Sequence, residues 1–150
     1  MKQTIFSAVT HVRQSICLLA LVGCAHQSLA ATADISGINY TDTYVSLFTL
    51  NGYPGPNVMP YRDGGGVCCI SVPEKWKPGM TVTVKWTDKR NANPIPWKTK
   101  VVEVPQYGLE DIGHFTVHFF PNDEIKVLVT TKYPGHPEYP FPSPKEYRKK

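Results

Sequence analysis

The chain has 150 residues, a formal net charge of +4 and 41% hydrophobic residues. Its 14 prolines and 11 glycines argue against a helical bundle, because both residue types break helices. The length predicts one domain. After the first thirty residues no apolar run is long enough to cross a bilayer as a helix, which argues against a transmembrane segment in the mature protein.

The first thirty residues are typical of an export signal. Lys2 and Arg13 precede an apolar run over residues 16–22, which is too short to remain in a bilayer as a helix. The run ends in Leu21-Val22-Gly23-Cys24. This motif resembles a bacterial lipobox, in which small residues fit the signal peptidase and the cysteine thiol receives a diacylglyceryl group.

We therefore predict a lipoprotein signal peptide over residues 1–23 and a tether over residues 24–33, with Cys24 as the lipidated first mature residue. Cleavage after Ser28-Leu29-Ala30 is the alternative, since this motif also has small residues at the required spacing. The residue after Cys24 is alanine, and the lack of aspartate there implies sorting to the outer membrane. Several acyl chains anchor a protein firmly, so we expect the mature protein to be held at that membrane, facing the periplasm.

The charge of the mature body argues against nucleic-acid binding. Residues 1–23 carry two bases and no acid, and residues 145–150 carry four bases and one acid. The body between them, residues 24–144, therefore holds ten bases and eleven acids. A nucleic-acid binder would cover a folded face with basic residues, whereas here the positive charge lies in a short tail.

Cys68 and Cys69 are the two cysteines expected in the mature domain, and they are adjacent. Neighbouring residues on a strand point to opposite faces, so a bond between them needs a local distortion, which the preceding Gly64-Gly65-Gly66 makes less costly. One interpretation is a vicinal disulfide, acting as a stiff ring or a redox switch in the oxidising envelope. The other is two small, buried hydrophobic residues that stay reduced. We expect no metal and no cofactor, because no further cysteine pair or histidine pair completes a zinc site.

Short segments rich in β-branched and aromatic residues alternate with turn residues along the body, which predicts strands. The clearest is 81–86, where Val82, Val84 and Trp86 point to one face and polar residues to the other. Seven strands are expected, over residues 35–40, 44–50, 67–72, 81–86, 97–104, 114–120 and 125–131. We predict an all-β domain over residues 34–132, an antiparallel sandwich or small barrel.

The core and the C-terminal end complete this expected architecture. Trp76, Trp86 and Trp97 are expected to supply much of the core, together with inward Phe and Val residues. Beyond the last strand, residues 133–144 contain five prolines and three aromatic residues. We predict that the Pro-rich, basic segment 133–150 is an extended arm, since it cannot join a central strand. Its aromatic side chains either cover the edge of the sandwich or form a binding strip, and we favour the covering role.

The sequence offers no clear catalytic constellation. On a strand, His114 and His118 lie about 13 Å apart, too far to share one metal ion, so we expect them to line a solvent-facing surface with Thr116. No serine lies in a Gly-x-Ser-x-Gly elbow, and Gly64-Gly65-Gly66 lacks the Lys-Ser/Thr that would hold a nucleotide phosphate. We predict that the protein is not an enzyme.

An ordered string of motifs resembles domain-of-unknown-function family 3304, small lipoproteins of Gram-negative bacteria. The resemblance covers about residues 34–141 and rests on the segments 64–73, 75–86, 117–122 and 133–140. Members often occur near type VI secretion genes and phospholipase effectors, which implies that they are immunity proteins. The family has no assigned activity and supplies no catalytic residues.

We therefore predict a non-enzymatic envelope lipoprotein that binds a protein partner, as an immunity or adaptor protein for a type VI secreted phospholipase effector. The alternatives are an envelope structural or small-ligand-binding lipoprotein, and a thiol-redox factor that uses the Cys68–Cys69 pair. Since Tyr and Arg dominate binding hot spots, the predicted partner contacts combine one loop with the arm. They are Tyr53, Tyr61, Arg62 and Asp63 in the loop, and Tyr133, His136, Tyr139 and Phe141 in the arm.

Overall fold

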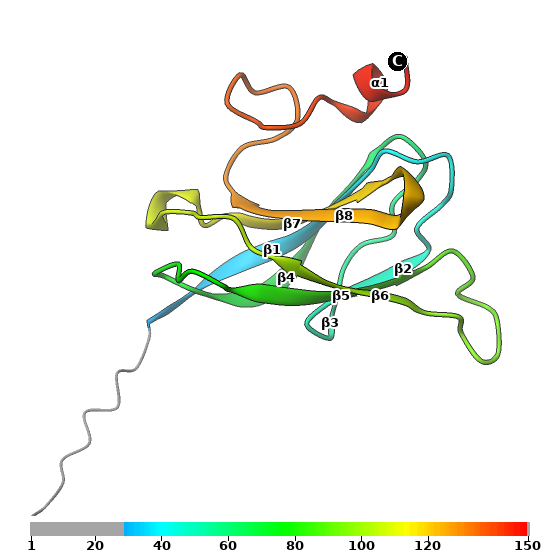
Figure 1. Cartoon of the computed structure of the whole chain (residues 1–150), viewed down its shortest axis with the longest axis horizontal. Helices are drawn as coiled ribbons and strands as arrows, with labels where there is room; N and C mark the ends of the chain where they lie inside the picture. The colour runs from blue at the N-terminus through cyan, green and yellow to red at the C-terminus, as the bar shows by residue number, and fades with distance from the viewer. Residues whose placement is uncertain (1–28, 150) are drawn as a thin grey trace, which may run out of the picture.

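The computed structural model describes residues 29–149, which form two four-stranded sheets packed face to face (Figure 1). The first sheet contains, in spatial order, β4 (Asp63–Pro73), β1 (Ala30–Asn39), β7 (His114–Phe120) and β8 (Glu124–Thr130). The second sheet contains β3 (Tyr53–Pro54), β2 (Leu47–Leu50), β5 (Thr81–Thr87) and β6 (Lys98–Glu103). The predicted all-β sandwich is confirmed, and the sheets do not close into a barrel.

The structure differs from the predicted strands in three respects. The additional strand β3 lies in a segment predicted to be a loop, which raises the number of strands to eight. Strand β1 begins at Ala30, so residues 30–33 belong to the first sheet and not to a tether. All strand pairs are antiparallel except β1 with β7, which run parallel. Strands β2 to β6 lie between these two in sequence. The predicted signal peptide, Cys24 and the tether up to residue 28 lie outside the described residues.

The core lies between the two sheets and follows the predicted alternation. Val82, Val84 and Trp86 of β5 point inward and are buried. Phe119 of β7 meets them from the first sheet, and its ring lies 5.2 Å from that of Phe48 in a T-shaped arrangement. Aromatic pairs with this geometry add stability beyond the area that they bury.

Only one of the three tryptophans is fully in this core. Trp86 is buried, and Trp76 is partly buried, with its indole Nε1 donating a 2.9 Å hydrogen bond to the Val104 carbonyl. The prediction for Trp97 is wrong, since its side chain is 41% exposed. The reason is its position just before β6, which lies at the edge of the second sheet.

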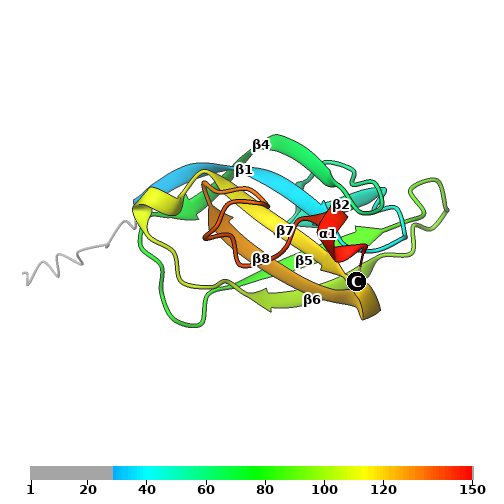
Figure 2. The ribbon, with the colours of Figure 1, turned by 90° about the horizontal axis from the view of Figure 1, so that it is seen from above.

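The C-terminal segment, residues 133–149 (the arm), covers the outer face of the first sheet over β7 and β8 (Figures 1 and 2). The favoured covering role is therefore confirmed, although the arm lies over a face and not along an edge. It turns at residues 133–139 and ends in the one-turn helix α1 (Pro144–Tyr147), so the prediction of a simply extended arm is wrong. The Ser143 side chain caps α1 by accepting a hydrogen bond from the Glu146 amide.

The arm buries polar residues of β7 that were expected to face solvent. His118 is 0% exposed, and its Nε2 lies 2.6 Å from the hydroxyl of Tyr139. Phe141 packs edge-on against the imidazole ring at 4.7 Å. The prediction of a solvent-facing surface is wrong for His118 and Thr116, because alternation along a strand cannot show that a distant segment covers its second face.

Candidate functional site

Strand β4 is irregular where it pairs with β1, within the glycine and cysteine motif noted in the sequence. The register shifts so that Asp34 of β1 lies opposite both Cys68 and Cys69 of β4. Two residues opposite one define a β-bulge. A second shift follows opposite Gly65, whose φ of +72° favours glycine. The local distortion expected for a bond between adjacent cysteines is therefore present.

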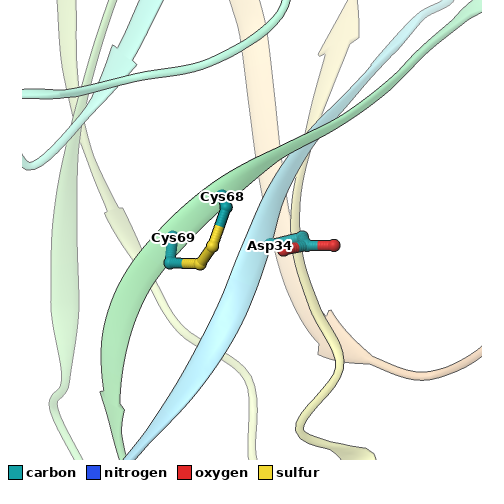
Figure 3. A group of neighbouring side chains, drawn as sticks. All are labelled: Asp34, Cys68 and Cys69. Carbon is teal, nitrogen blue, oxygen red and sulfur yellow. A yellow bond between two sulfur atoms is a disulfide. The ribbon is translucent and has the colours of Figure 1, made fainter.

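Cys68 and Cys69 are joined as a vicinal disulfide (Figure 3). Cys68 is exposed and Cys69 is half-buried, so the interpretation of the pair as two buried, reduced hydrophobic residues is wrong. Strand β4 is an edge strand of the first sheet, with β1 as its neighbour in that sheet. The exposed residue Cys68 therefore lies at an open edge of the first sheet.

Asp34 is the third member of this site, and it lies on the neighbouring strand β1 (Figure 3). A carboxylate oxygen of Asp34 and the two cysteine sulfurs all lie within 4.8 Å of one another. The bonded sulfurs hold no thiolate, whereas reduction would place two thiols and a carboxylate together. Sequence reasoning did not identify Asp34, because only the bulged register brings this residue to the cysteines.

A polar strip continues from Asp34 across the outer face of the first sheet. Asp34 pairs with His114 of β7, and two residues further on Ser36 Oγ lies 2.7 Å from Thr116 Oγ1. A hollow of about 210 Å³ adjoins this strip, between the glycine-rich part of β4 and the beginning of the arm. The hydroxyl of Tyr133 contacts His114 Nε2, so the arm forms one wall of the hollow.

The predicted partner contacts in the arm fall into two groups. Tyr133 is 61% exposed and His136 is exposed, so both are accessible to a partner. Tyr139 is buried and Phe141 is half-buried, and both pack on the first sheet. Burial therefore removes Tyr139 from the set of surface contacts, since its ring and hydroxyl are used within the fold.

The predicted contacts in the loop join those in the arm only in part, since Asp63 lines the same hollow as Tyr133. Arg62 and Asp63 are exposed near the start of β4. Tyr61 is half-buried, with the Arg148 guanidinium 5.3 Å from its ring centroid. Its ring lines a cleft of about 350 Å³. Tyr53 lies elsewhere, on the second sheet.

The outer face of the second sheet is uncovered among the residues that the structure describes. No segment within residues 29–149 lies over this face, whereas the arm lies over the outer face of the first sheet (Figure 1). Val101 of β6 is 64% exposed on this face, opposite Thr83 of β5. Trp97, which is 41% exposed, lies beside Thr83 and Lys85 on this face. We call this surface the open face; it comprises Thr49, Thr83, Lys85, Trp97 and Val101.

Together these features define an open β-sandwich. The arm covers the outer face of its first sheet, the outer face of its second sheet is uncovered among the described residues, and a vicinal disulfide lies at an exposed edge. The chain belongs to the family described as "Protein of unknown function (DUF3304)", whose sequence profile matches residues 38–127. The family resemblance expected from the sequence is thus confirmed. Comparison with curated proteins and with solved structures finds no match. Among residues 29–149, no helix has the length and apolar character needed to span a membrane.

Proposed function

We propose that this protein is a non-enzymatic lipoprotein of the cell envelope, anchored through Cys24 to the outer membrane, that binds a protein partner in the periplasm. The proposed partner is a type VI secreted phospholipase effector, which the protein neutralises or accompanies. The observation that carries the proposal is the open face, where aromatic and aliphatic side chains remain exposed on a regular sheet. A regular sheet is a rigid support for such contacts.

The composition of the open face suits a protein interface. Trp97 is of a residue type that often carries binding energy, and Val101 lies exposed on the same face. Thr49, Thr83 and Lys85 lie beside Trp97 and supply polar groups, as the rim of a protein interface requires. A stable complex needs about 800 Å² of surface from each partner, which a four-stranded sheet face with its flanking loops can supply.

The lipid anchor would place this surface near its target. Lipidation at Cys24 leaves six residues before β1 begins at Ala30. Such a segment spans at most about 20 Å when extended, so the sandwich would be held close to the membrane. A phospholipase that attacks this membrane would therefore meet its inhibitor at the site of attack.

The first test is protection of a host cell. A phospholipase effector encoded beside this chain is exported to the periplasm, with or without the full-length chain, and growth and co-purification are measured. We expect the chain to restore growth, and the Cys24→Ala variant to protect less because it lacks the anchor. Trp97→Ala should weaken effector binding at least about tenfold, a loss of about 1.4 kcal/mol.

Tyr133→Ala is the matched control for the open face, since it removes an exposed aromatic residue from the arm on the other sheet. We expect it to bind the effector like the unmodified chain. If Tyr133→Ala loses binding and Trp97→Ala does not, the interface lies on the arm and not on the open face. Failure of both rescue and co-purification would contradict the proposal, and recovery of envelope assembly proteins instead would favour a structural role.

A thiol-redox factor is the second candidate, and the accessible disulfide favours it. A disulfide between adjacent residues closes the shortest loop, so in the chain-entropy view it adds only about 1 kcal/mol to stability. Attack of a dithiol on Cys68 Sγ would form a mixed disulfide and release Cys69 as a thiolate, which then takes up a proton. The second thiol of the dithiol would complete the exchange, leaving both cysteines reduced and the dithiol oxidised.

Cys68→Ser separates a redox role from a structural one. We expect this variant to lower the free energy of unfolding by no more than about 1 kcal/mol. It should also lose the interconversion of disulfide and dithiol with periplasmic dithiol proteins, because Cys69 alone cannot form the internal bond. Urea unfolding and alkylation trapping in cells measure the two effects. A large loss of stability with unchanged exchange partners would show that the pair is structural.

A further inference from the structure

We propose that reduction of the Cys68–Cys69 disulfide opens a binding site for a thiophilic divalent cation such as Zn²⁺. The protein ligands are the two cysteine sulfurs and a carboxylate oxygen of Asp34. The proposal rests on the premise of the second candidate function, namely that a dithiol can reduce the pair. It goes beyond that function, because it assigns the reduced state a ligand and Asp34 a role.

The positions of the three ligand atoms support one shared ion. All three lie within 4.8 Å of one another. Around a tetrahedral zinc ion, sulfur at about 2.3 Å and oxygen at about 2.0 Å place neighbouring ligand atoms about 3.5 to 3.8 Å apart. Once the bond is broken, rotation about the Cα–Cβ bonds of the cysteines moves the two sulfurs apart, toward that spacing.

The bulge explains why two adjacent cysteines can face one ion. On a regular strand their side chains would point to opposite faces of the sheet. Here the bulge places both residues opposite Asp34, so the three side chains converge on one side of the β1–β4 pair. The neighbouring Gly66 leaves space, since a Cβ there would lie no closer than 3.5 Å to the Asp34 side chain.

The exposure and charge of the site also suit a cation. Cys68 is exposed and the other two residues are half-buried, so an ion can enter from solvent and keep a fourth position for water or an external ligand. Two thiolates and one carboxylate carry three negative charges, which a divalent cation neutralises in large part. Soft thiolate ligands select zinc and similar ions over magnesium or calcium.

The redox state of the two cysteines decides whether this site can bind the cation. A dithiol supplies two electrons and two protons, converts the disulfide to two thiols and itself becomes a disulfide. Binding of the cation then releases the two thiol protons to solvent. In the oxidised state neither sulfur is a thiolate, so the cluster offers only the Asp34 carboxylate and does not hold the ion.

The test uses the full mature protein in detergent, before and after reduction with a phosphine that is then removed under argon. Thiol counting confirms reduction, and Cd²⁺ is titrated while the ultraviolet thiolate-to-metal charge-transfer band is followed; Zn²⁺ affinity is measured by competition with a chromogenic chelator. We expect one equivalent bound by the reduced protein and none by the oxidised protein. Asp34→Asn should weaken Zn²⁺ binding about tenfold.

Asp63→Asn is the matched control, because Asp63 is an exposed carboxylate on the same strand β4 but lies outside the cluster. We expect it to bind Zn²⁺ with unchanged affinity. A fully reduced protein that binds no metal overturns the metal site while leaving disulfide exchange intact, and a pair that resists reduction overturns both. Equal affinity of Asp34→Asn and the unmodified protein would exclude Asp34 as a ligand and overturn the proposed three-ligand site.

Discussion

Acidification from pH 7 to pH 4 is expected to remove about 3 kcal/mol of folding stability through one histidine. His118 is fully buried between β7 and the arm, and burial lowers its pKa to about 3. In the unfolded chain the same imidazole has its ordinary pKa of 6.5. Between these two values the unfolded chain binds a proton that the folded protein does not.

The direction of the effect follows from this difference. As the pH falls below 6.5, protonation stabilises the unfolded chain by about 1.4 kcal/mol per pH unit, and the contribution levels off below pH 3. The groups that face His118 are Tyr139 and Phe141 of the arm, Tyr40 just after β1, Phe120 of β7 and Lys126 of β8. None of them offers a carboxylate to pair with an imidazolium, and Lys126 opposes its charge.

The measurement is urea unfolding at several pH values for the unmodified protein and for His118→Gln. Glutamine keeps a polar partner for the Tyr139 hydroxyl but does not titrate, so the variant should lose about 3 kcal/mol less between pH 7 and pH 4. Carboxylates contribute to acid unfolding in both proteins, among them Glu138, whose pKa is lowered by its hydrogen bond to Lys132. Identical pH dependence in the two proteins would contradict the assignment to His118.

The strands of the core could be predicted from the sequence because their alternation is regular. Val82, Val84 and Trp86 are separated by polar residues, and the structure buries these three side chains as expected. Exposed strands are harder to interpret. Val101 and Trp97 have apolar side chains but lie on or next to an edge strand, where no second layer covers the outward-pointing groups.

The candidate site could be predicted only in part. The adjacent cysteines and the preceding glycines indicated a distorted strand, and the bulge at Cys68 and Cys69 agrees with that reasoning. Asp34 could not be found, because its place beside the cysteines depends on which residues of β1 and β4 pair. Burial of His118 depends likewise on Tyr139 and Phe141, which follow β7 only after another strand.

Phe48→Ala is expected to cost about 3 to 5 kcal/mol, because this ring lies at the centre of the core. Phe48 is 1% exposed and packs against the ring of Phe119. Its own ring passes directly over Gly55, where an added Cβ would lie only 2.0 Å from Phe48 Cζ. Gly55→Ala should therefore be strongly destabilising too, since real Cβ atoms do not approach other atoms so closely.

The double variant Phe48→Ala/Gly55→Ala tests whether this single contact links the two positions. Removal of the ring leaves room for the new methyl group, so the double variant should be at least about 1 kcal/mol more stable than the sum of the single effects predicts. Gly66→Ala serves as the control, because its Cβ would meet the nearest atom at an ordinary 3.5 Å. Urea unfolding of all four variants measures the coupling, and strict additivity would show that the Phe48 ring is not what excludes a side chain at position 55.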